Sequence, residues 1–233
     1  MSGDNKQNSN LKIIAYIHTD FKSKFGIPCQ SGLVDSLKGT IVFEPEFRNF
    51  DALRGLEEFS HIWIVWKFSE NVRNEFSPTV RSPRFGDNKR MGVFATRSPY
   101  RPNPIGLSCV KLDCIKEHPK RGHILQVLGA DLMDKTPIYD IKPYIPYTDS
   151  HPDAVGGLAE THRRELLKVE FPQKWLNVIP KESLDPLIGV LAQDPRLGYK
   201  EDPQRVYGFV FSNYDVRFTV AEDVVKVREI VKL

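Results

Sequence analysis

The segment Gly92–Ser108, GVFATRSPYRPNPIGLS, combines a rigid backbone with side chains that can bind charge. Its three prolines fall within six positions, and each fixes φ and removes one backbone N–H donor. Asn103 lies between two of these prolines, and Arg97 and Arg101 project from the same stretch. Arginines held in this way suit a carboxylate or a phosphate. The pattern indicates a binding platform, and a stiff strand connector with solvated arginines is the alternative interpretation.

A second polar segment, Asp131–Asp149, follows an apolar run in which a strand is expected. It contains Asp131, Asp134, Asp140 and Asp149 together with Thr136 and three tyrosines. Side chains that follow a strand line the rim of a barrel, which predicts a ligand site there. The carboxylates could complement a cationic ligand, hold a divalent metal or pair with the arginines of the preceding segment. Their spacing matches neither an EF-hand nor an H-E-x-x-H site, so no metal site is predicted.

Several common catalytic motifs are missing from the chain. There is no G-x-S-x-G elbow for a nucleophilic serine, and no phosphate-binding G-x-x-x-x-G-K-[ST] motif. No G-x-G occurs, which argues against the usual dinucleotide-binding fold. His61 stands at the start of an apolar strand, where a histidine is more often structural than catalytic.

The three cysteines, Cys29, Cys109 and Cys114, form no C-x-x-C pair, so neither a disulfide framework nor a thiolate zinc site is predicted. We expect all three to behave as small buried apolar residues.

Composition and charge narrow the class of protein. The 233 residues are 40% hydrophobic and 27% charged, as in folded globular proteins. The longest apolar run, Ile62–Trp66, is far shorter than the ~20 residues that a membrane-spanning helix needs. The polar first ten residues lack the apolar stretch of a secretory signal, which favours a cytoplasmic protein. The net charge of +3 combines +5 between Arg73 and Arg101 with −2 elsewhere, so the basic residues gather in one segment.

The first part of the chain is rich in strand patterns. One short helix is expected from Asn49, its cap, to about Phe59. The intervening stretch Phe21–Leu37 is too long for a hairpin turn and is a candidate functional loop. Five strands with one short helix predict a mainly β fold, an antiparallel β-barrel or sandwich. The strands are expected at Lys12–Thr19, Thr40–Phe43, His61–Phe68, Leu107–Ile115 and Ile124–Leu128, the third of them covered on both faces.

A change of composition at DSHPDAVGG, from Asp149, predicts a linker and therefore two domains, residues 1–150 and 151–233. The second is expected to be a small α+β unit. Its predicted elements are a strand at Lys168–Phe171, helices at Pro172–Val178 and Ser183–Gln193, and strands at Val206–Phe211, Val216–Val220 and Val224–Val231.

Four strings occur in order between Lys24 and Asp149: KFGIPCQSGLV, EFSHIWIVWKF, GVFATRSPYRPNPIGLS and DKTPIYDIKPYIPYTD. Together they resemble the YaeB/TsaA-like family, the TrmO-type tRNA (adenine-N6)-methyltransferases. In the second domain, QDPR (193–196) with Tyr199, and YGFVFSNYDVRF further on, are similar to the C-terminal signature of that family.

The resemblance implies a fold, an activity and partners. It implies an S-adenosylmethionine-dependent methyltransferase built on a β-barrel, which accounts for the missing G-x-G. The implied reaction is N6-methylation of threonylcarbamoyl-adenosine beside the anticodon of tRNA, carried out by a homodimer. S-adenosylmethionine carries a sulfonium, an ammonium, a carboxylate and an adenine ring, so its site needs acids, a cation and flat apolar surface close together. The two polar segments described above supply all of these.

The resemblance also assigns site residues. The implied cofactor-binding residues are Pro28, Cys29, Gln30, His61, Ile62, Phe94, Arg97, Leu107, Asp131, Asp134, Thr136 and Ile138. Asp194, Arg196 and Tyr199 are implied to lie near the substrate as catalytic candidates, with Asp194 the candidate general base. Phosphate contacts from the basic segment are expected from Arg81, Arg84, Lys89, Arg90 and Arg101. Cys29 stands where many relatives have arginine, and DPRLGY replaces the more usual DPRPAY.

Two other functions fit the same residues. A non-catalytic RNA-binding barrel would use the basic segment and the aromatic residues for RNA and the aspartates only as braces. A methyltransferase of a small metabolite would leave the second domain and the basic segment without a role.

Overall fold

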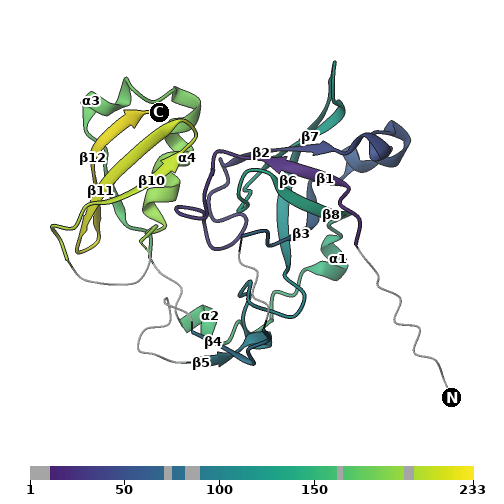
Figure 1. The fold of residues 1–233 in the computed structure, drawn as a ribbon, viewed down its shortest axis with the longest axis horizontal. Coiled ribbons are helices and arrows are strands. Elements are labelled where there is room, and N and C mark those ends of the chain that lie inside the picture. The colour runs from purple at the N-terminus through teal and green to yellow at the C-terminus, as the bar shows by residue number, and fades with distance from the viewer. Residues whose placement is uncertain (1–10, 71–74, 82–89, 162–164, 197–201) are drawn as a thin grey trace.

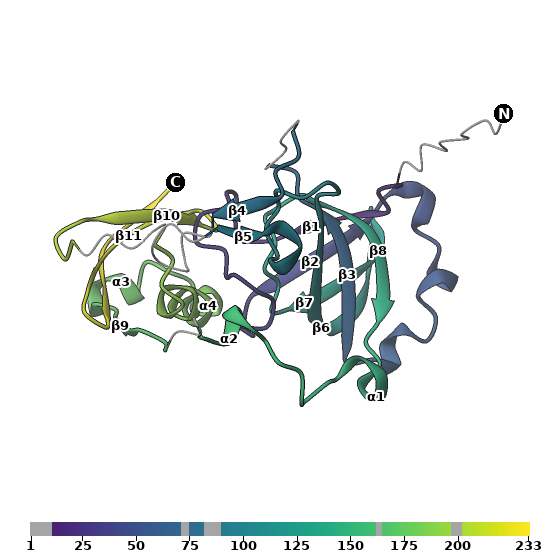
Figure 2. The same ribbon diagram turned by 90° about the horizontal axis from the view of Figure 1, so that it is seen from below.

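A computed structural model describes residues 11–70, 75–81, 90–161, 165–196 and 202–233 (Figure 1). The chain is mainly β, as the sequence predicts. Two groups of strands lie side by side, one formed by the first part of the chain and the other by its last third (Figures 1 and 2). Among the described residues, no helix combines the length and apolar character needed to cross a membrane.

Six strands of the first part form a closed barrel in the order β1-β2-β7-β6-β3-β8, with every neighbouring pair antiparallel. Inward-facing side chains such as Ile17, Ile41, Ile64 and Leu125 are fully buried and fill it. The β-branched residues that predict strands therefore also supply the core. The strands are β1 (Ala15–His18), β2 (Lys38–Phe43), β3 (His61–Lys67), β6 (Ile105–His118), β7 (Gly122–Leu128) and β8 (Thr136–Pro143).

Two sequence predictions about the barrel strands were wrong in detail. Strand β8 was not expected, because its two prolines and aspartate suggested a polar rim instead of a strand. Strand β3 is not covered on both faces, because its burial alternates and only Ile62, Ile64 and Trp66 point inward.

The helix expected from Asn49 to Phe59 is instead a pair of 3₁₀ turns, η2 (Phe50–Leu53) and η3 (Leu56–Glu58), which follow a first turn η1 (Pro45–Phe47). Asn49 does cap η2, since its side chain accepts a hydrogen bond from the Asp51 N–H at 3.0 Å. Gly55, with φ of 85°, separates the two turns and prevents a continuous helix.

Shorter elements connect the barrel strands and leave the barrel. The hairpin β4 (Thr79–Arg81) and β5 (Arg90–Gly92) precedes a 3₁₀ turn, η5 (Val93–Ala95), and the proline-rich segment. After β8 come two single-turn helices, α1 (Pro146–Asp149) and α2 (Leu158–Thr161).

The last third forms a four-stranded sheet in the order β10-β11-β12-β9, which packs against helix α4. Helix α4 begins at Lys181 after Pro180, so the prediction that Ser183 caps it was wrong; proline at this position fits a helix start. The elements are β9 (Lys168–Glu170), α3 (Gln173–Leu176), α4 (Lys181–Ala192), β10 (Tyr207–Phe211), β11 (Tyr214–Ala221) and β12 (Val224–Lys232).

The long connection between β1 and β2, residues 19–37, lies between the two groups of strands. Its residues Phe21, Val34 and Leu37 are buried in the hydrophobic cluster of the C-terminal sheet. A backbone hydrogen bond from the Ser212 N–H to the Asp20 carbonyl, 2.7 Å long, joins the connection to the turn after β10. The β1–β2 connection thus contributes side chains to the hydrophobic cluster of the C-terminal sheet.

The cysteines depart from the prediction that all three are buried. Cys29 is exposed, and Cys109 and Cys114 are half-buried. All three are free thiols. Cys109 lies on the outward-facing side of β6, opposite Trp63 of β3, which explains its partial exposure.

Candidate functional site

A pocket of about 430 Å³ opens at the end of the barrel where β3 ends and where β6 and β8 begin. Its walls come from four segments that are far apart in the sequence: the β1–β2 connection, the end of β3, the proline-rich segment with the start of β6, and the β7–β8 connection. The lining residues are Lys24, Ile27, Pro28, Cys29, Gln30, Trp66, Lys67, Phe68, Ser69, Glu70, Thr96, Arg97, Arg101, Ile105, Gly106, Leu107, Asp131, Met133 and Thr136.

Asp131 provides a carboxylate at the wall of this pocket and is held there by a neighbour. The Ser108 hydroxyl donates to Asp131 Oδ1 at 2.6 Å, and the Trp66 indole N–H donates to Ser108 Oγ at 3.0 Å. Burial raises the pKa of the Asp131 carboxyl, while the Ser108 hydrogen bond, backbone N–H groups and the charge of Arg97 oppose that rise. Asp131 is therefore a carboxylate whose ionised form is costly without a cation nearby.

Trp66 can occupy its place because the residue paired with it across the sheet is Gly106. A Cβ on Gly106 would lie 2.2 Å from Cε2 of the Trp66 ring, a distance that no side chain tolerates. The glycine therefore lets the indole lie flat against β6 and form one wall of the pocket.

The proline-rich segment is fixed by its own arginines. Arg101 Nη1 donates to the carbonyl oxygens of Thr96 at 2.8 Å and Ser98 at 3.3 Å, which folds the segment back on itself. Arg97 Nη1 donates to Oε1 of Gln30, so the proline-rich segment contacts the β1–β2 connection across the pocket. The proline-rich segment, predicted to be a binding platform, is thus held by hydrogen bonds and lies at a pocket wall.

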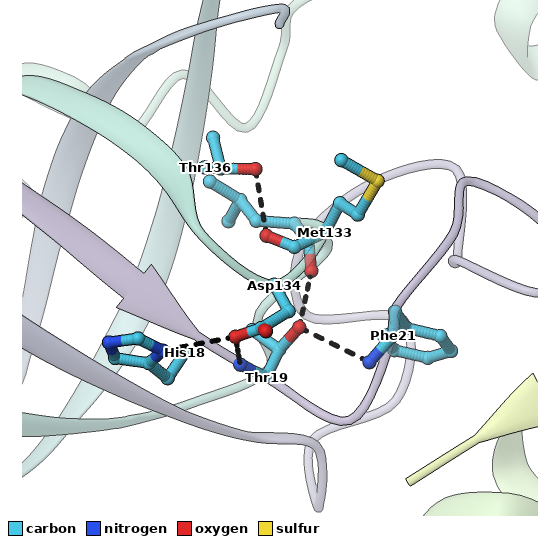
Figure 3. Close-up of polar contacts among 7 residues, drawn as sticks. His18, Thr19, Phe21, Met133, Asp134 and Thr136 are labelled. Atoms are coloured by element: carbon cyan, nitrogen blue, oxygen red, sulfur yellow. Dashed lines mark hydrogen bonds and ion pairs between the residues drawn. The ribbon is translucent and has the colours of Figure 1, made fainter. Parts of the chain in front are cut away.

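The β7–β8 connection is held by contacts with the end of β1 (Figure 3). Asp134 Oδ1 lies 3.1 Å from His18 Nδ1 and accepts from the Thr19 N–H at 3.3 Å. The Thr19 hydroxyl donates to the Leu132 carbonyl at 2.9 Å, and the Thr136 hydroxyl donates to the Met133 carbonyl at 2.8 Å. These contacts close a turn and fix the segment that carries the pocket residues Asp131, Met133 and Thr136.

Seven of the residues expected at a cofactor site line the pocket together: Pro28, Cys29, Gln30, Arg97, Leu107, Asp131 and Thr136. They come from three of the four wall segments, so the sequence strings that carry the resemblance converge in space.

The other five expected cofactor residues do not line this pocket. Ile62 and Ile138 are fully buried inside the barrel, and Asp134 fixes the β7–β8 connection from behind. Phe94 is 72% exposed and stacks on Phe76, with ring centroids 6.4 Å apart. His61 begins β3, whereas the pocket lies at the other end of that strand, about 16 Å along it.

The expected phosphate-binding residues fall into three groups. Arg81 and Arg90 are exposed and directly opposite each other in the β4–β5 hairpin, which leads into the pocket through η5. Arg101 belongs to the pocket wall. Arg84 and Lys89 lie outside the described residues.

Asp194 and Arg196 lie just beyond the end of α4 and form a bidentate ion pair. Arg196 Nε and Nη2 donate to Asp194 Oδ1 and Oδ2 at 2.7 and 2.8 Å. Asp194 is buried and Arg196 is half-buried, and Asp194 adopts a positive φ of 53°. Neither residue lines the pocket, and Tyr199 lies outside the described residues.

Trp66, Gly106 and Ser108 are site residues that the sequence analysis missed. Trp66 shares the inward phase of β3 with two isoleucines and therefore looks like ordinary core. Ser108 was detectable in principle, because a serine in the inward phase between Gly106 and Val110 must find a hydrogen-bond partner inside the barrel.

The chemistry of the lining defines the ligand class. Asp131 and Glu70 supply negative charge, and Trp66 and Phe68 supply flat apolar surface. The cations are Lys24, Lys67, Arg97 and Arg101. Such a lining fits a ligand that carries charges of both signs together with an aromatic ring. Among the described residues, no group of three histidine, cysteine or acidic side chains is placed to hold a metal ion.

Comparisons with known proteins agree with this ligand class. A family model described as the tRNA-methyltransferase O N-terminal domain matches residues 16–150, and one described as the TrmO C-terminal domain matches residues 164–233. A tRNA (adenine(37)-N6)-methyltransferase of Escherichia coli (strain K12) is 42% identical over 217 residues, which cover 90% of this chain and 92% of that protein.

Two further comparisons extend this similarity. A protein of Pyrococcus abyssi, named as a probable S-adenosyl-L-methionine-binding protein, is 37% identical over 155 residues, covering 66% of this chain and 78% of that protein. A crystal structure of TrmO from Pseudomonas aeruginosa superposes with a TM-score of 0.79 at 31% identity and covers 99% of this chain and 100% of that one.

Proposed function

Because the chain belongs to the TrmO family of tRNA methyltransferases, we propose that it transfers the methyl group of S-adenosylmethionine to N6 of an adenosine in tRNA. The observation that carries the proposal is the pocket at the barrel end, where Asp131 meets arginines and an indole wall. The acceptor is the threonylcarbamoyl-adenosine beside the anticodon.

The pocket fits the methyl donor in size and chemistry. Its volume of about 430 Å³ lies within the range of small-molecule sites. Asp131 and Glu70 suit the ammonium and sulfonium charges, Arg97 suits the carboxylate, and the Trp66 ring suits the adenine. When bound, S-adenosylmethionine supplies an activated methyl group, so the protein needs no nucleophile of its own.

The residues of the chain act by positioning. The hydrogen bonds of Arg101 and Arg97 fix the proline-rich wall, and the Asp134 contacts fix the wall formed by the β7–β8 connection, so the pocket does not need to reorganise when it fills. Methyl transfer requires the reacting atoms to lie in line within about 3–3.5 Å, and rigid walls favour that geometry.

The β4–β5 hairpin is the proposed contact to the RNA. Arg81 and Arg90 face each other across the two strands, an arrangement of like charges that is unfavourable in isolation. A phosphate between them would remove that repulsion. The hairpin continues through η5 into Thr96 and Arg97, which line the pocket, so a bound backbone would lie near the methyl donor.

Asp194, Arg196 and Tyr199 belong to the proposed substrate side. Both carboxylate oxygens of Asp194 already accept hydrogen bonds from Arg196. A carboxylate engaged in this way is better suited to holding the chain that follows α4 than to taking the N6 proton. We assign the pair to positioning in place of general-base catalysis.

The working unit of the proposal is a cytoplasmic homodimer in which residues 1–150 bind the donor and residues 151–233 assist with the substrate. The outward face of β3 and β6 supports a second copy, since Trp63 pairs with Cys109 and Val65 with Leu107, which is 53% exposed. Light scattering is expected to give twice the chain mass, and Val65→Asp is expected to give a monomer. Val206→Asp, on an exposed residue of the second unit, is the control.

Transfer of labelled methyl from S-adenosylmethionine to bulk tRNA, followed by digestion to nucleosides, tests the activity. Label is expected in N6-methylated threonylcarbamoyl-adenosine, and tRNA transcripts that lack the threonylcarbamoyl group are the matched control. Absence of donor binding in calorimetry would favour the RNA-binding alternative. Label in small metabolites but not in tRNA would favour a methyltransferase that acts on a small metabolite.

A further inference from the structure

Ser108 is a buried polar residue that lies next to the pocket and holds Asp131 in place. It is 1% exposed, does not line the pocket, and lies in β6 behind the wall formed by Trp66 and Asp131. It contacts both of these residues, through the 3.0 Å bond from the indole and the 2.6 Å bond to the carboxylate. A hydroxyl between a wall residue and the acid of the pocket can determine how that acid behaves.

The chemistry of the three groups fixes the direction of their hydrogen bonds. An indole N–H can only donate, so a lone pair of Ser108 Oγ must accept it. The single hydroxyl hydrogen of Ser108 is then donated in a hydrogen bond to Asp131 Oδ1. This arrangement requires Oδ1 to be an unprotonated acceptor. The indole also polarises the hydroxyl and strengthens its bond to the carboxylate.

We propose that Ser108 is a positioning residue. It accepts a hydrogen bond from the Trp66 indole and donates its own hydroxyl hydrogen in a hydrogen bond to Asp131. As a result, Asp131 presents an ionised carboxylate to a cationic group of the methyl donor. The inference rests on the proposed function for the identity of that ligand. The relay of hydrogen bonds from Trp66 to Ser108 to Asp131 involves only residues of this chain and exists before any ligand binds.

The electrostatic surroundings make such a relay necessary. Burial raises the pKa of Asp131, so the carboxyl needs donors to stay ionised near neutral pH. The other charged or titratable groups that face the pocket are Lys24 and Cys29 from the β1–β2 connection, Lys67 and Glu70 from the end of β3, and Arg97 and Arg101 from the proline-rich segment. Ser108 donates directly to the carboxylate, whereas Arg97 acts on it through charge.

The direct test follows the Asp131 carboxyl in the free protein. Its ¹³C resonance, assigned by its loss in Asp131→Asn, is titrated in the wild type and in Ser108→Ala. The titration midpoint is expected to rise in Ser108→Ala. Thr40→Val is the control, since it removes a half-buried barrel hydroxyl that accepts a hydrogen bond from the Gln126 amide, and it should leave the midpoint unchanged. An unchanged midpoint in folded Ser108→Ala would overturn the proposal.

A second variant covers the case in which Ser108→Ala does not fold, since alanine leaves the Trp66 N–H without a partner. Ser108→Cys keeps the size of the side chain but offers a weak donor, so its midpoint should shift in the same direction by less. A midpoint equal to that of the wild type in Ser108→Cys would also count against the relay.

Calorimetry then connects the relay to the ligand. For Ser108→Ala the Kd of S-adenosylmethionine at pH 6 should rise about tenfold relative to the wild type, with a smaller difference at pH 8.5. Equal losses at both pH values would show a merely structural role and overturn the inference. If the wild type binds no S-adenosylmethionine, the proposed function fails, and the ¹³C titration still decides whether the relay exists.

Discussion

Asp131, half-buried at the end of the barrel, and Asp194, buried after α4, are carboxylates with very different partners. Asp194 is neutralised by a bidentate guanidinium at 2.7 and 2.8 Å. Asp131 accepts a hydrogen bond from the Ser108 hydroxyl, with 2.6 Å between the two oxygens, and interacts with Arg97 through charge, while burial raises its pKa. A fully paired carboxylate holds a structure together. A carboxylate whose charge is incompletely compensated favours the binding of a cation. Asp131 is of this kind, and it is the one that lines the pocket.

Breaking the Asp194–Arg196 pair should have the largest effect. Arg196→Leu removes the bidentate guanidinium partner of a buried carboxylate, which we expect to lower the free energy of unfolding by about 3–5 kcal/mol in a urea titration. Asp194→Asn/Arg196→Leu removes the charge as well and should recover much of that loss. A double variant as unstable as the single one would contradict the view that the uncompensated charge is responsible.

Filling the space over Gly106 should come next. Gly106→Ala places a Cβ against the Trp66 ring, which should displace the indole, cost about 1–3 kcal/mol of stability and weaken S-adenosylmethionine binding in calorimetry. Gly92→Ala is a matched control, because that glycine has a negative φ of −55° and no atom near its missing Cβ. Loss of binding in both variants would argue against a specific role for the indole wall.

Removing the charge of Asp131 should separate binding from stability. The pKa of Asp131 is higher in the folded state than in the unfolded state. Stability therefore falls as pH rises from the unfolded pKa to the folded pKa, and this loss is absent below the unfolded pKa. Asp131→Asn should therefore raise the melting temperature by a few degrees at pH 7 and by less at pH 4, while it abolishes donor binding. A variant less stable than the wild type at pH 7 would show that Asp131 is structural.

The smallest effect is expected at Asp149, a carboxylate at the surface. Its pKa is lowered by the Ile145 N–H and the Trp63 indole, both of which donate to Oδ2 at 2.9 Å. The contribution of this carboxylate to folding stability is fully present above its unfolded pKa and is lost as pH falls through its lower folded pKa. Asp149→Ala should slightly reduce the melting temperature at pH 7 and have no effect near pH 2. A reduction that is equal at both pH values would exclude the carboxylate charge as its cause.

The sequence predicts the barrel strands well where β-branched and aromatic residues gather, as in β1 and β3, and where apolar and polar residues alternate, as in β6. It fails at β8, where Pro137 and Pro143 conceal a strand that tertiary pairing with β1 and β3 stabilises. Among site residues, the family resemblance assigns Arg97 and Asp131 to the cofactor site, and Arg97 lies in a string that is long and distinctive. It does not assign Trp66 or Ser108, whose roles depend on a contact between two strands that are separated by about 40 residues of chain.

The β1–β2 connection makes the two halves of the chain interdependent. Gly26, with a φ of 85°, lies against Phe209 of the C-terminal sheet, and a few residues later the same connection supplies Pro28, Cys29 and Gln30 to the pocket. A shortened protein that stops at residue 150 would expose Phe21, Val34 and Leu37 to water and leave that wall unsupported. The barrel strands would still pair, but the pocket would have to order this wall each time a ligand binds.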